Sequence, residues 1–259
     1  MTIQQTISRA RTLLASASDA PDLDTERLLL HVLKKADAAW IYAHNDTELT
    51  EAQNDFFQEL ITQRASGKPL AYILGEAEFY GRPFYVDENV LVPRPETEGL
   101  IHETLKYVSK NAKGNNTFTI ADIGTGSGCI AITLALELPA HFTIIAIDIS
   151  PEALEVAKRN AVRHHVIDKI KFIQGNMLEP LKDQRVDLIV SNPPYIPTSE
   201  LNVSLKSDAL DTRGLVFEPR LALDGGIDGQ TYVKQIKKSG VPFILETTGG
   251  LVSLLRREG

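Results

Sequence analysis

An Asn-Pro-Pro-Tyr sequence at 192–195 follows, after Ser191, the largely apolar run Val-Asp-Leu-Ile-Val (186–190), which is typical of a buried strand. Proline ends a strand and removes a backbone donor, so Pro193 and Pro194 fix a rigid turn whose backbone offers acceptors. The side-chain carbonyl of Asn192 and the backbone carbonyl of Pro193 can accept both N–H bonds of a planar amide or aromatic amine. Tyr195 can pack its ring on the flat group that carries this nitrogen. Such a pocket suits methyl transfer to a delocalised nitrogen, because the acceptors favour a nitrogen that becomes pyramidal.

Three glycines between a predicted strand and a predicted helix indicate a loop that a ligand can approach closely. The loop consists of Gly124, Thr125, Gly126, Ser127 and Gly128. The dinucleotide fingerprint would need a glycine at the position of Cys129, and the lysine of a phosphate-binding loop is absent. A pyrophosphate ligand is therefore disfavoured. A nucleoside without phosphate, such as S-adenosylmethionine, suits the loop better.

Polar side chains at the ends of the neighbouring predicted strands complete a nucleoside site. Asp148 ends the strand that follows the loop, where a carboxylate can accept hydrogen bonds from both hydroxyls of a ribose. Asn176 and Met177 follow the next strand and are expected to contact an adenine. Asp122 precedes the loop and either reaches the ammonium of the ligand through water or holds the loop by hydrogen bonds. At each of these positions an ordinary turn or helix cap is the structural alternative.

Strands and helices alternate from about residue 117 onward, and these elements must position the side chains above. The expected strands are 117–124, 142–150, 169–175 and 186–192, and the expected helices are 129–138 and 151–165. Near-continuous apolar strands between helices predict an α/β fold with a parallel, Rossmann-like sheet that is covered on both faces. In such sheets ligands bind at the carboxyl ends of the strands, where the glycine loop, Asp148 and Asn192 would meet.

Residues 1–70 predict a small bundle of helices. Apolar residues recur at helical spacing near the N-terminus, and Thr50 with Gln53 makes the pattern of a capping box. Trp40, Phe56 and Phe57 are expected to pack in the core of this bundle rather than to form a binding site. No residue type or spacing in the bundle predicts catalysis.

The composition is that of an ordinary globular protein with an acidic balance. The chain has 259 residues, a formal net charge of −7 and 43% hydrophobic residues. This charge argues against broad binding to a phosphate backbone, which requires a basic surface. The single cysteine, Cys129, allows no internal disulfide, and the scattered histidines do not predict a metal site. Neither a signal peptide nor a membrane span is evident, so we expect a cytosolic protein.

The glycine loop, Asp148 and the Asn-Pro-Pro-Tyr sequence resemble those of class I S-adenosylmethionine-dependent methyltransferases that methylate nitrogen. A close resemblance to the release factor glutamine methyltransferase family lies in AYILGEAEFYGRPFYVDENVLVPRPETEGL (71–100) and FEPRLALDGGIDG (217–229). The resemblance covers nearly the whole chain. It implies three parts: a helical substrate-recognition domain over 1–70, a β-hairpin linker over 71–92 and an S-adenosylmethionine-binding methyltransferase domain over 93–259.

In that family a methyl group passes from S-adenosylmethionine, with S-adenosylhomocysteine as product, to the N5 nitrogen of a glutamine. This glutamine belongs to the Gly-Gly-Gln motif of class 1 peptide chain release factors. By position, the resemblance implies a cofactor site made of Gly124 to Gly128, Asp148, Met177 and Asn192. It implies that Asn192, Pro193 and Tyr195 are catalytic and that these residues, together with Pro194, hold the glutamine amide. The turn Arg94-Pro95-Glu96-Thr97 would help to close the site.

We further expect a cytoplasmic monomer that needs no metal, touches no membrane and takes no nucleic acid as substrate. Two alternatives stay open, an adenine-N6 nucleic acid methyltransferase and a non-catalytic adapter that kept the fold.

Some features depart from the family pattern. Asn176 stands where aspartate is frequent, and FILETTGG (243–250) differs from the usual sequence after the fifth strand. The chain is also short between Ile236 and Pro242, and the family usually has a closing pair of strands beyond Gly259.

Overall fold

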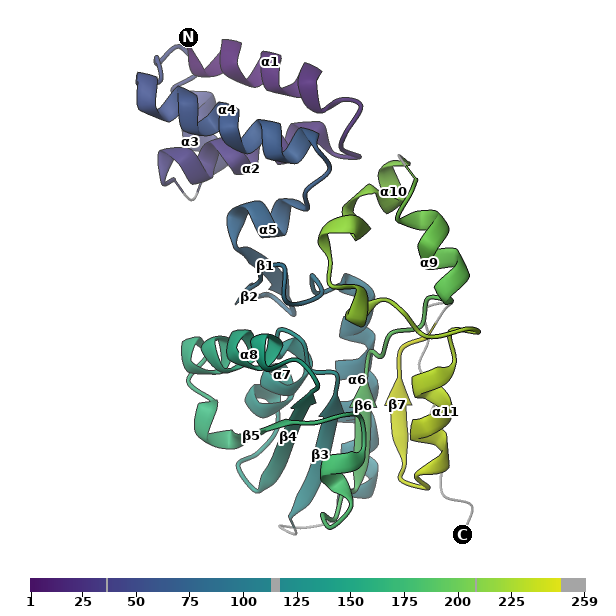
Figure 1. The fold of residues 1–259 in the computed structure, drawn as a ribbon. Helices are drawn as coiled ribbons and strands as arrows, with labels where there is room; N and C mark the ends of the chain where they lie inside the picture. Colours follow the sequence, from purple (N-terminus) through teal and green to yellow (C-terminus); the bar gives the residue numbers. More distant parts are fainter. Residues whose placement is uncertain (36, 113–116, 208, 248–259) are drawn as a thin grey trace. The chain divides into compact units, whose positions relative to one another are not determined.

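The computed structural model describes residues 1–35, 37–112, 117–207 and 209–247. They form two compact units. Figure 1 shows the ribbon, with colours that follow the sequence from the N-terminus to the C-terminus. One unit consists of Met1–Gly75 and Ser204–Phe217, and the other of Glu76–Val203 and the described residues from Glu218 onward. The chain thus returns to the helical unit at a segment that the sequence placed in the methyltransferase domain. The last three residues of FILETTGG (243–250) lie outside the described residues.

The first unit is a bundle of short helices. Its helices are α1 (Ile3–Leu14), α2 (Pro21–Leu33), α3 (Ala38–Ala43), α4 (Glu51–Ala65), α5 (Leu70–Leu74), α10 (Leu210–Arg213) and the 3-10 helix η4 (Gly214–Phe217). The predicted capping box is present, since the Thr50 hydroxyl accepts from the Gln53 backbone N–H at 3.2 Å. Phe57 is fully buried, but Phe56 is 42% exposed, so the prediction that both pack in the core is wrong for Phe56. Successive helix residues point about 100° apart, so one of two neighbours turns away from the core.

Gly67 is the point at which the returning segment packs within this unit. Gly67 has φ of +96°, and Cγ of Arg213 lies 2.4 Å from the place that a Cβ of residue 67 would take. The Arg213 guanidinium also donates a hydrogen bond to the backbone carbonyl of Ser16 at 3.3 Å. A side chain at position 67 would therefore push Arg213 out of its place.

The second unit is built on a five-stranded sheet in the order β5-β4-β3-β6-β7, and every pairing in it is parallel. The strands are β3 (Phe118–Ile123), β4 (Phe142–Asp148), β5 (Ile170–Gln174), β6 (Leu188–Ser191) and β7 (Phe243–Leu245). An antiparallel hairpin, β1 (Glu76–Phe79) with β2 (Arg82–Tyr85), precedes them. The predicted α/β fold with a parallel sheet is confirmed.

Helices connect these strands and cover them. The α-helices are α6 (Glu98–Asn111), α7 (Cys129–Glu137), α8 (Pro151–Arg163), α9 (Thr198–Ser204) and α11 (Thr231–Lys238). The 3-10 helices are η1 (Pro95–Thr97), η2 (Ile167–Lys169), η3 (Glu179–Leu181) and η5 (Arg220–Ala222). Ser150 caps α8 by accepting from the Ala153 N–H at 3.0 Å.

Alternate residues of the strands point to opposite faces of the sheet, and both faces are buried. Ile120, Ile144 and Leu188 belong to one core together with residues of α6, α7 and α8. Ile145 and Ile189 belong to a second core together with residues of α11. Burial on both faces is why these strands read as continuous apolar runs.

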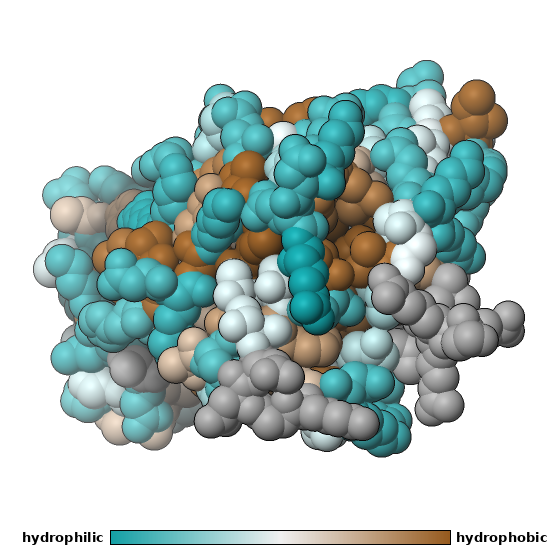
Figure 2. Space-filling view, turned by 90° about the horizontal axis from the view of Figure 1, so that it is seen from below, coloured by the Kyte–Doolittle hydropathy of each residue, from teal (hydrophilic) through white to brown (hydrophobic). Residues whose placement is uncertain are grey.

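The second face has fewer helices over it, because the connection from β5 to β6 contains only the short helix η3. A hollow of about 440 Å³ lies there, lined in part by Leu178, Leu181, Val186 and Val241. Figure 2, which looks from below the view of Figure 1, shows an apolar band with polar residues on either side. Across the described ranges, no helix combines the length and the apolar character that crossing a bilayer demands.

Candidate active site

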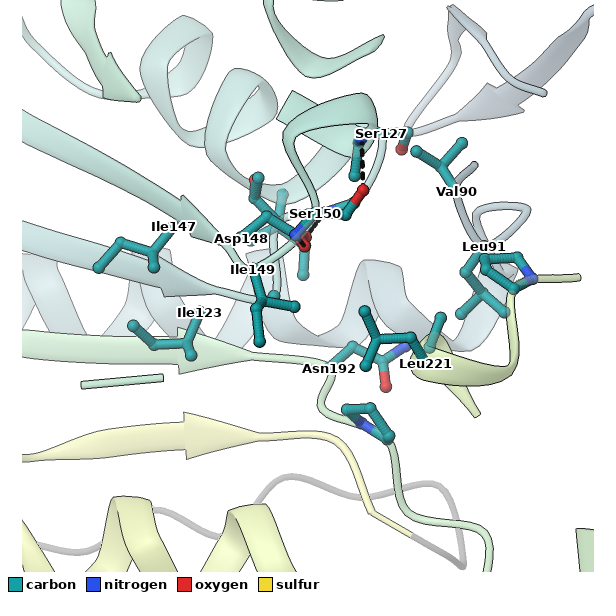
Figure 3. Close-up of a pocket in the computed structure, with 18 of the residues that line it drawn as sticks. Val90, Leu91, Ile123, Ser127, Ile147, Asp148, Ile149, Ser150, Asn192 and Leu221 are labelled. Atoms are coloured by element: carbon teal, nitrogen blue, oxygen red, sulfur yellow. Dashed lines mark hydrogen bonds between the residues drawn. The ribbon is translucent and has the colours of Figure 1, made fainter. Parts of the chain in front are cut away.

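A cavity of about 240 Å³ opens at the carboxyl ends of the central strands (Figure 3). The strand order reverses at β3, since β4 and β5 lie on one side of it and β6 and β7 on the other. Ligands bind at such switch points of open α/β sheets. The register pairs Ile123 with Ile147, and both residues line the cavity.

The glycine loop lines this cavity from Gly124 to Ser127. Gly124 and Gly126 have φ of 71° and 54°, a left-handed conformation that favours glycine. A Cβ on either residue would meet no atom within 4 Å beyond its chain neighbours, so a ligand can approach this backbone. The N–H groups of Gly124 and Thr125 donate to the Ile147 carbonyl at 2.8 and 2.9 Å, which ties the loop to β4.

Gly128 is required for a different reason. Its φ is +81°, and a Cβ there would lie 2.9 Å from Cδ1 of Ile132 and 3.1 Å from Cβ of Ala157. Gly128 precedes α7, and Ala157 lies on α8, so the missing side chain lets the two helices pack closely. Gly124 and Gly126 thus leave space for a ligand, whereas Gly128 leaves space for a helix.

Asp148, at the tip of β4, lines the cavity and also supports the loop. One carboxylate oxygen accepts from the Gly126 N–H at 2.9 Å, and the other accepts from the Ser150 N–H at 3.0 Å. Burial raises the pKa of Asp148, while the backbone N–H groups of Ser150, Gly126 and Ile149 oppose that change. Each carboxylate oxygen has two lone pairs, so Asp148 can still accept hydrogen bonds from a ribose. Asn176 and Met177 line the same cavity after β5.

Asp122 lies beneath the loop rather than in the cavity. It is fully buried, and its Oδ2 accepts from the Thr125 hydroxyl at 2.6 Å and from the Ala131 N–H at 3.2 Å. Among the residues that the structure describes, none forms a hydrogen bond with its Oδ1. Burial raises the pKa of Asp122 to about 7, although the bonds from Thr125 and Ala131 lower it. Of the two roles left open by the sequence, the hydrogen bonds support the one in which Asp122 holds the loop.

This buried carboxyl predicts a pH-dependent stability. The folded chain keeps a proton on Asp122 up to a pH of about 7, whereas the ordinary value is 3.8, so unfolding releases that proton between these values. The free energy of unfolding should therefore fall as pH rises from about 4 to 7, by on the order of 4 kcal/mol from this group. Asp122→Asn should remove this part of the slope in urea unfolding measured at pH 5 and pH 8. The exposed Asp168→Asn is the matched control, and parallel pH curves for wild type and Asp122→Asn would refute the assignment.

The Asn-Pro-Pro-Tyr turn leaves β6 at the opposite side of the cavity from Asp148, as Figure 3 shows for Asn192. Asn192 and Pro194 line the cavity, whereas Pro193 is buried and Tyr195 is half-buried behind it. The Nδ2 of Asn192 donates to the Thr97 hydroxyl at 3.0 Å. The sequence thus placed Asn192 correctly at the end of the strand, but Tyr195 does not line the cavity.

Within the second unit, the stretch from Leu223 to Gly225 holds this turn in place. The Ile196 N–H donates to the Leu223 carbonyl at 3.1 Å, and the Gly225 N–H donates to the Ile196 carbonyl at 2.8 Å. A Cβ on Gly225 would lie 2.7 Å from Cα of Tyr195, so glycine is needed for this close approach. Gly225 in FEPRLALDGGIDG (217–229) is therefore explained by a local contact, which fixes the backbone of the turn.

An ion pair joins the same segment to the turn at 94–97. The Arg94 guanidinium donates to both carboxylate oxygens of Glu218 at 2.7 Å. Glu218 is buried, and burial raises its pKa, while Arg94 lowers it. Arg94 and Thr97 both line the cavity, so the turn that the sequence singled out lies at the site.

Sequence reasoning missed several residues that complete the cavity. Apolar side chains form much of its wall, among them Val90, Leu91, Ile149, Leu221 and Tyr232. Figure 3 shows Ile149 and Leu221 facing the space beside Asn192. Apolar residues are also what forms the core, so no pattern in the sequence marked these as part of a site.

Two kinds of chemistry receive no support from the side chains. Burial raises the pKa of Cys129 to about 12, so this thiol is neutral at physiological pH and is a poor nucleophile. Within the part of the chain that the structure describes, no three His, Cys, Asp or Glu side chains gather as metal ligands would. The polar groups at the cavity are hydrogen-bond acceptors and donors, which suits binding and orientation.

Comparison with known proteins gives two family models that match the chain. The PrmC N-terminal domain matches residues 5–75, and the methyltransferase small domain matches residues 104–212. The release factor glutamine methyltransferase of Geobacter sulfurreducens is 39% identical over 244 residues, which cover 94% of this chain and 80% of that protein. The enzyme of the same name from Xylella fastidiosa (strain Temecula1) is 39% identical over 242 residues, which cover 93% of this chain and 82% of that protein.

Among solved structures, the catalytic domain of hMettl16 in complex with a MAT2A 3′UTR hairpin is similar, with a TM-score of 0.50. The match covers 74% of this chain and 70% of that chain at 19% identity, so the likeness concerns the methyltransferase fold alone. The two bacterial relatives are similar at much higher identity and over most of both chains. The helical unit, the cavity at the ends of β3, β4 and β6, and these relatives agree, and the chain belongs to the release factor glutamine methyltransferase family.

Proposed function

We propose that this chain transfers a methyl group from S-adenosylmethionine to N5 of the glutamine in the Gly-Gly-Gln motif of class 1 peptide chain release factors. The observation that carries the proposal is the placement of Asn192. It lines the cavity beside the glycine loop, and its amide nitrogen already donates to Thr97. Its amide oxygen is therefore left to accept a hydrogen bond from the amide of a substrate.

The cofactor S-adenosylmethionine fits the groups around the cavity. When bound, it supplies a methyl group on a sulfonium, which is a good electrophile and needs no nucleophilic side chain of the protein. Asp148 would accept from the ribose hydroxyls, since it keeps free lone pairs beside its bonds to Gly126 and Ser150. The open backbone of Gly124 and Gly126 would receive the ligand without a side chain in the way.

At the glutamine, the task of the protein is to hold and orient the amide. The nitrogen lone pair of an amide is delocalised, so it is a weak nucleophile. Acceptors on both N–H bonds, the side-chain oxygen of Asn192 and the backbone carbonyl of Pro193, would favour a pyramidal nitrogen that can react. This is positioning combined with electrostatic stabilisation of the transition state. Tyr195 would support the turn and pack near the flat group.

The substrate assignment is tested with radiolabelled S-adenosylmethionine and three acceptors: a class 1 release factor, its variant with Gln→Ala in the Gly-Gly-Gln loop, and DNA. We expect label on the release factor alone. Label on DNA, or label that survives the Gln→Ala change, would overturn the assignment. The DNA arm also separates glutamine methylation from adenine-N6 methylation, which shares the acceptor chemistry.

The same proposal places the protein in the cytoplasm, where release factors meet ribosomes, and gives the helical unit a part in holding the release factor. We also propose that the protein acts as a monomer. Light scattering after size-exclusion chromatography measures that mass directly, and the mass of the chain alone is 28.5 kDa.

A further inference from the structure

Two buried side chains, Thr97 in the wall of the cavity and Glu246 next to it, form a hydrogen-bonded relay with residues of the Asn-Pro-Pro-Tyr turn. The Thr97 hydroxyl donates to Oε2 of Glu246 at 2.6 Å, and Nδ2 of Asn192 donates to the same Thr97 oxygen at 3.0 Å. The Tyr195 hydroxyl donates to the other oxygen of Glu246 at 3.4 Å. Thr97 is 2% exposed and Glu246 is 4% exposed, so bulk water does not compete for these bonds.

Three separate parts of the second unit meet in this relay. Thr97 ends η1 before α6, Asn192 follows β6, and Glu246 follows β7. The Glu246 N–H donates to the Ser191 carbonyl at 3.1 Å, which fixes the end of β7 beside the end of β6. The carboxylate is thus held by its own backbone as well as by two hydroxyls, so its position is well determined.

The direction of each hydrogen bond follows from the number of protons available. A threonine hydroxyl has one proton, and Thr97 gives it to Glu246. Toward Asn192 the same oxygen can therefore only accept, so the amide must turn its nitrogen to Thr97. The amide oxygen is then on the other side. Glu246 in this way determines which end of the Asn192 amide is free.

We propose that Thr97 and Glu246 are positioning residues, which hold the Asn192 amide with its oxygen free to accept a hydrogen bond from the substrate amide. This inference rests on the proposed function, because it assumes that the substrate offers an N–H to Asn192. Without the relay the Asn192 amide can rotate by half a turn, so that its N–H groups face the N–H of the substrate. Two donors that face each other repel, and the substrate amide would no longer be held. The relay also accounts for asparagine at 192, since an aspartate there would compete with Glu246 for the single Thr97 proton.

The first test compares Thr97→Val with Thr97→Ser. Valine keeps the branched shape but loses the hydroxyl, so kcat for release factor methylation should fall on the order of tenfold to 100-fold. Serine keeps the hydroxyl and should stay within about threefold of wild type. The Kd for S-adenosylmethionine should change by less than about twofold in both variants, because the relay acts on the substrate side. Equal losses in the two variants, or wild-type kcat in Thr97→Val, would contradict the relay.

A second pair of variants addresses the other end of the relay. Glu246→Gln still offers an oxygen to Thr97, whereas Glu246→Leu offers none, so only the leucine variant should lose kcat to the extent of Thr97→Val. The losses of Thr97→Val and Glu246→Leu should not add in the double variant, because both act through the same amide. Additive losses would mean that the two residues act separately and would overturn the proposal.

A measurement without substrate separates this inference from the proposed function. In nitrogen-15 spectra, the side-chain N–H signals of Asn192, assigned by their loss in Asn192→Ala, should exchange slowly with water in the wild type and faster in Thr97→Val. If the wild type fails to methylate a release factor, the proposed function is wrong, and this exchange still decides the relay. Equal exchange in wild type and Thr97→Val would refute the relay even if methylation occurs.

Discussion

Asn192→Ala is expected to lower kcat for release factor methylation on the order of 1,000-fold, while the Kd for S-adenosylmethionine changes by less than about fivefold. Asn192 lines the cavity and has its amide nitrogen bound to Thr97, which leaves the oxygen for the substrate. An acceptor that holds the N–H of a reacting amide acts mainly in the transition state, so its loss should appear in kcat. Cofactor binding should persist, because the glycine loop and Asp148 are unchanged.

The measurement combines label transfer at saturating substrates with calorimetric titration of S-adenosylmethionine. Asn202→Ala is a matched control, since Asn202 is exposed on α9 and its side chain bonds to Arg220. This control should keep wild-type kcat. Near-normal turnover in Asn192→Ala would contradict the amide-holding mechanism, whatever the affinity for the cofactor.

The parts of the site that lie at strand ends could be predicted from the sequence. Buried parallel strands read as continuous apolar runs, and their ends are marked by a change to glycine, acidic or amide residues. Gly124, Asp148 and Asn192 each follow directly on such a run or end it, and all three line the cavity. Each of these residues could be placed at the cavity from the end of its own strand. The order of the strands in the sheet was not needed for that prediction.

The supporting contacts could not be predicted, because they join residues that are far apart in the chain. The bond between Thr97 and Glu246 spans 149 positions, and the one between Arg94 and Glu218 spans 124. Nothing in the local pattern around Glu246 indicates that its carboxylate is buried against a threonine. Such contacts appear only when the strand order brings the ends of β6 and β7 beside the start of α6.

The returning segment Ser204–Phe217 shows the same limit on the scale of a domain. The predicted domains were continuous stretches of the chain, 1–70, 71–92 and 93–259. A return of the chain to the helical unit was therefore not predicted. Gly67 follows α4, so its place in the sequence suggests no more than the end of a helix. The structure adds that the space left by its missing side chain is filled by Arg213.

Asp148→Asn is expected to produce the reverse pattern to Asn192→Ala, with the Kd for S-adenosylmethionine raised on the order of 100-fold and kcat at saturating cofactor nearly kept. Both carboxylate oxygens of Asp148 accept backbone hydrogen bonds, from Gly126 and from Ser150. An asparagine has one oxygen, so its NH₂ group would face one of these N–H donors, and the acceptors for the ribose would be reduced as well. The loop and the nucleoside would lose support together.

Titration of S-adenosylmethionine by calorimetry measures this change, and Glu155→Gln, an exposed substitution on α8, controls for the loss of one negative charge. A Kd within about threefold of wild type in Asp148→Asn would contradict the ribose assignment, since two charge-assisted bonds are worth far more. A Kd defect shared by Asp148→Asn and Asn192→Ala would instead mean that Asn192 belongs to the cofactor site. The opposite patterns expected here, Kd for Asp148 and kcat for Asn192, therefore divide the cavity into a side that binds the donor and a side that orients the acceptor amide.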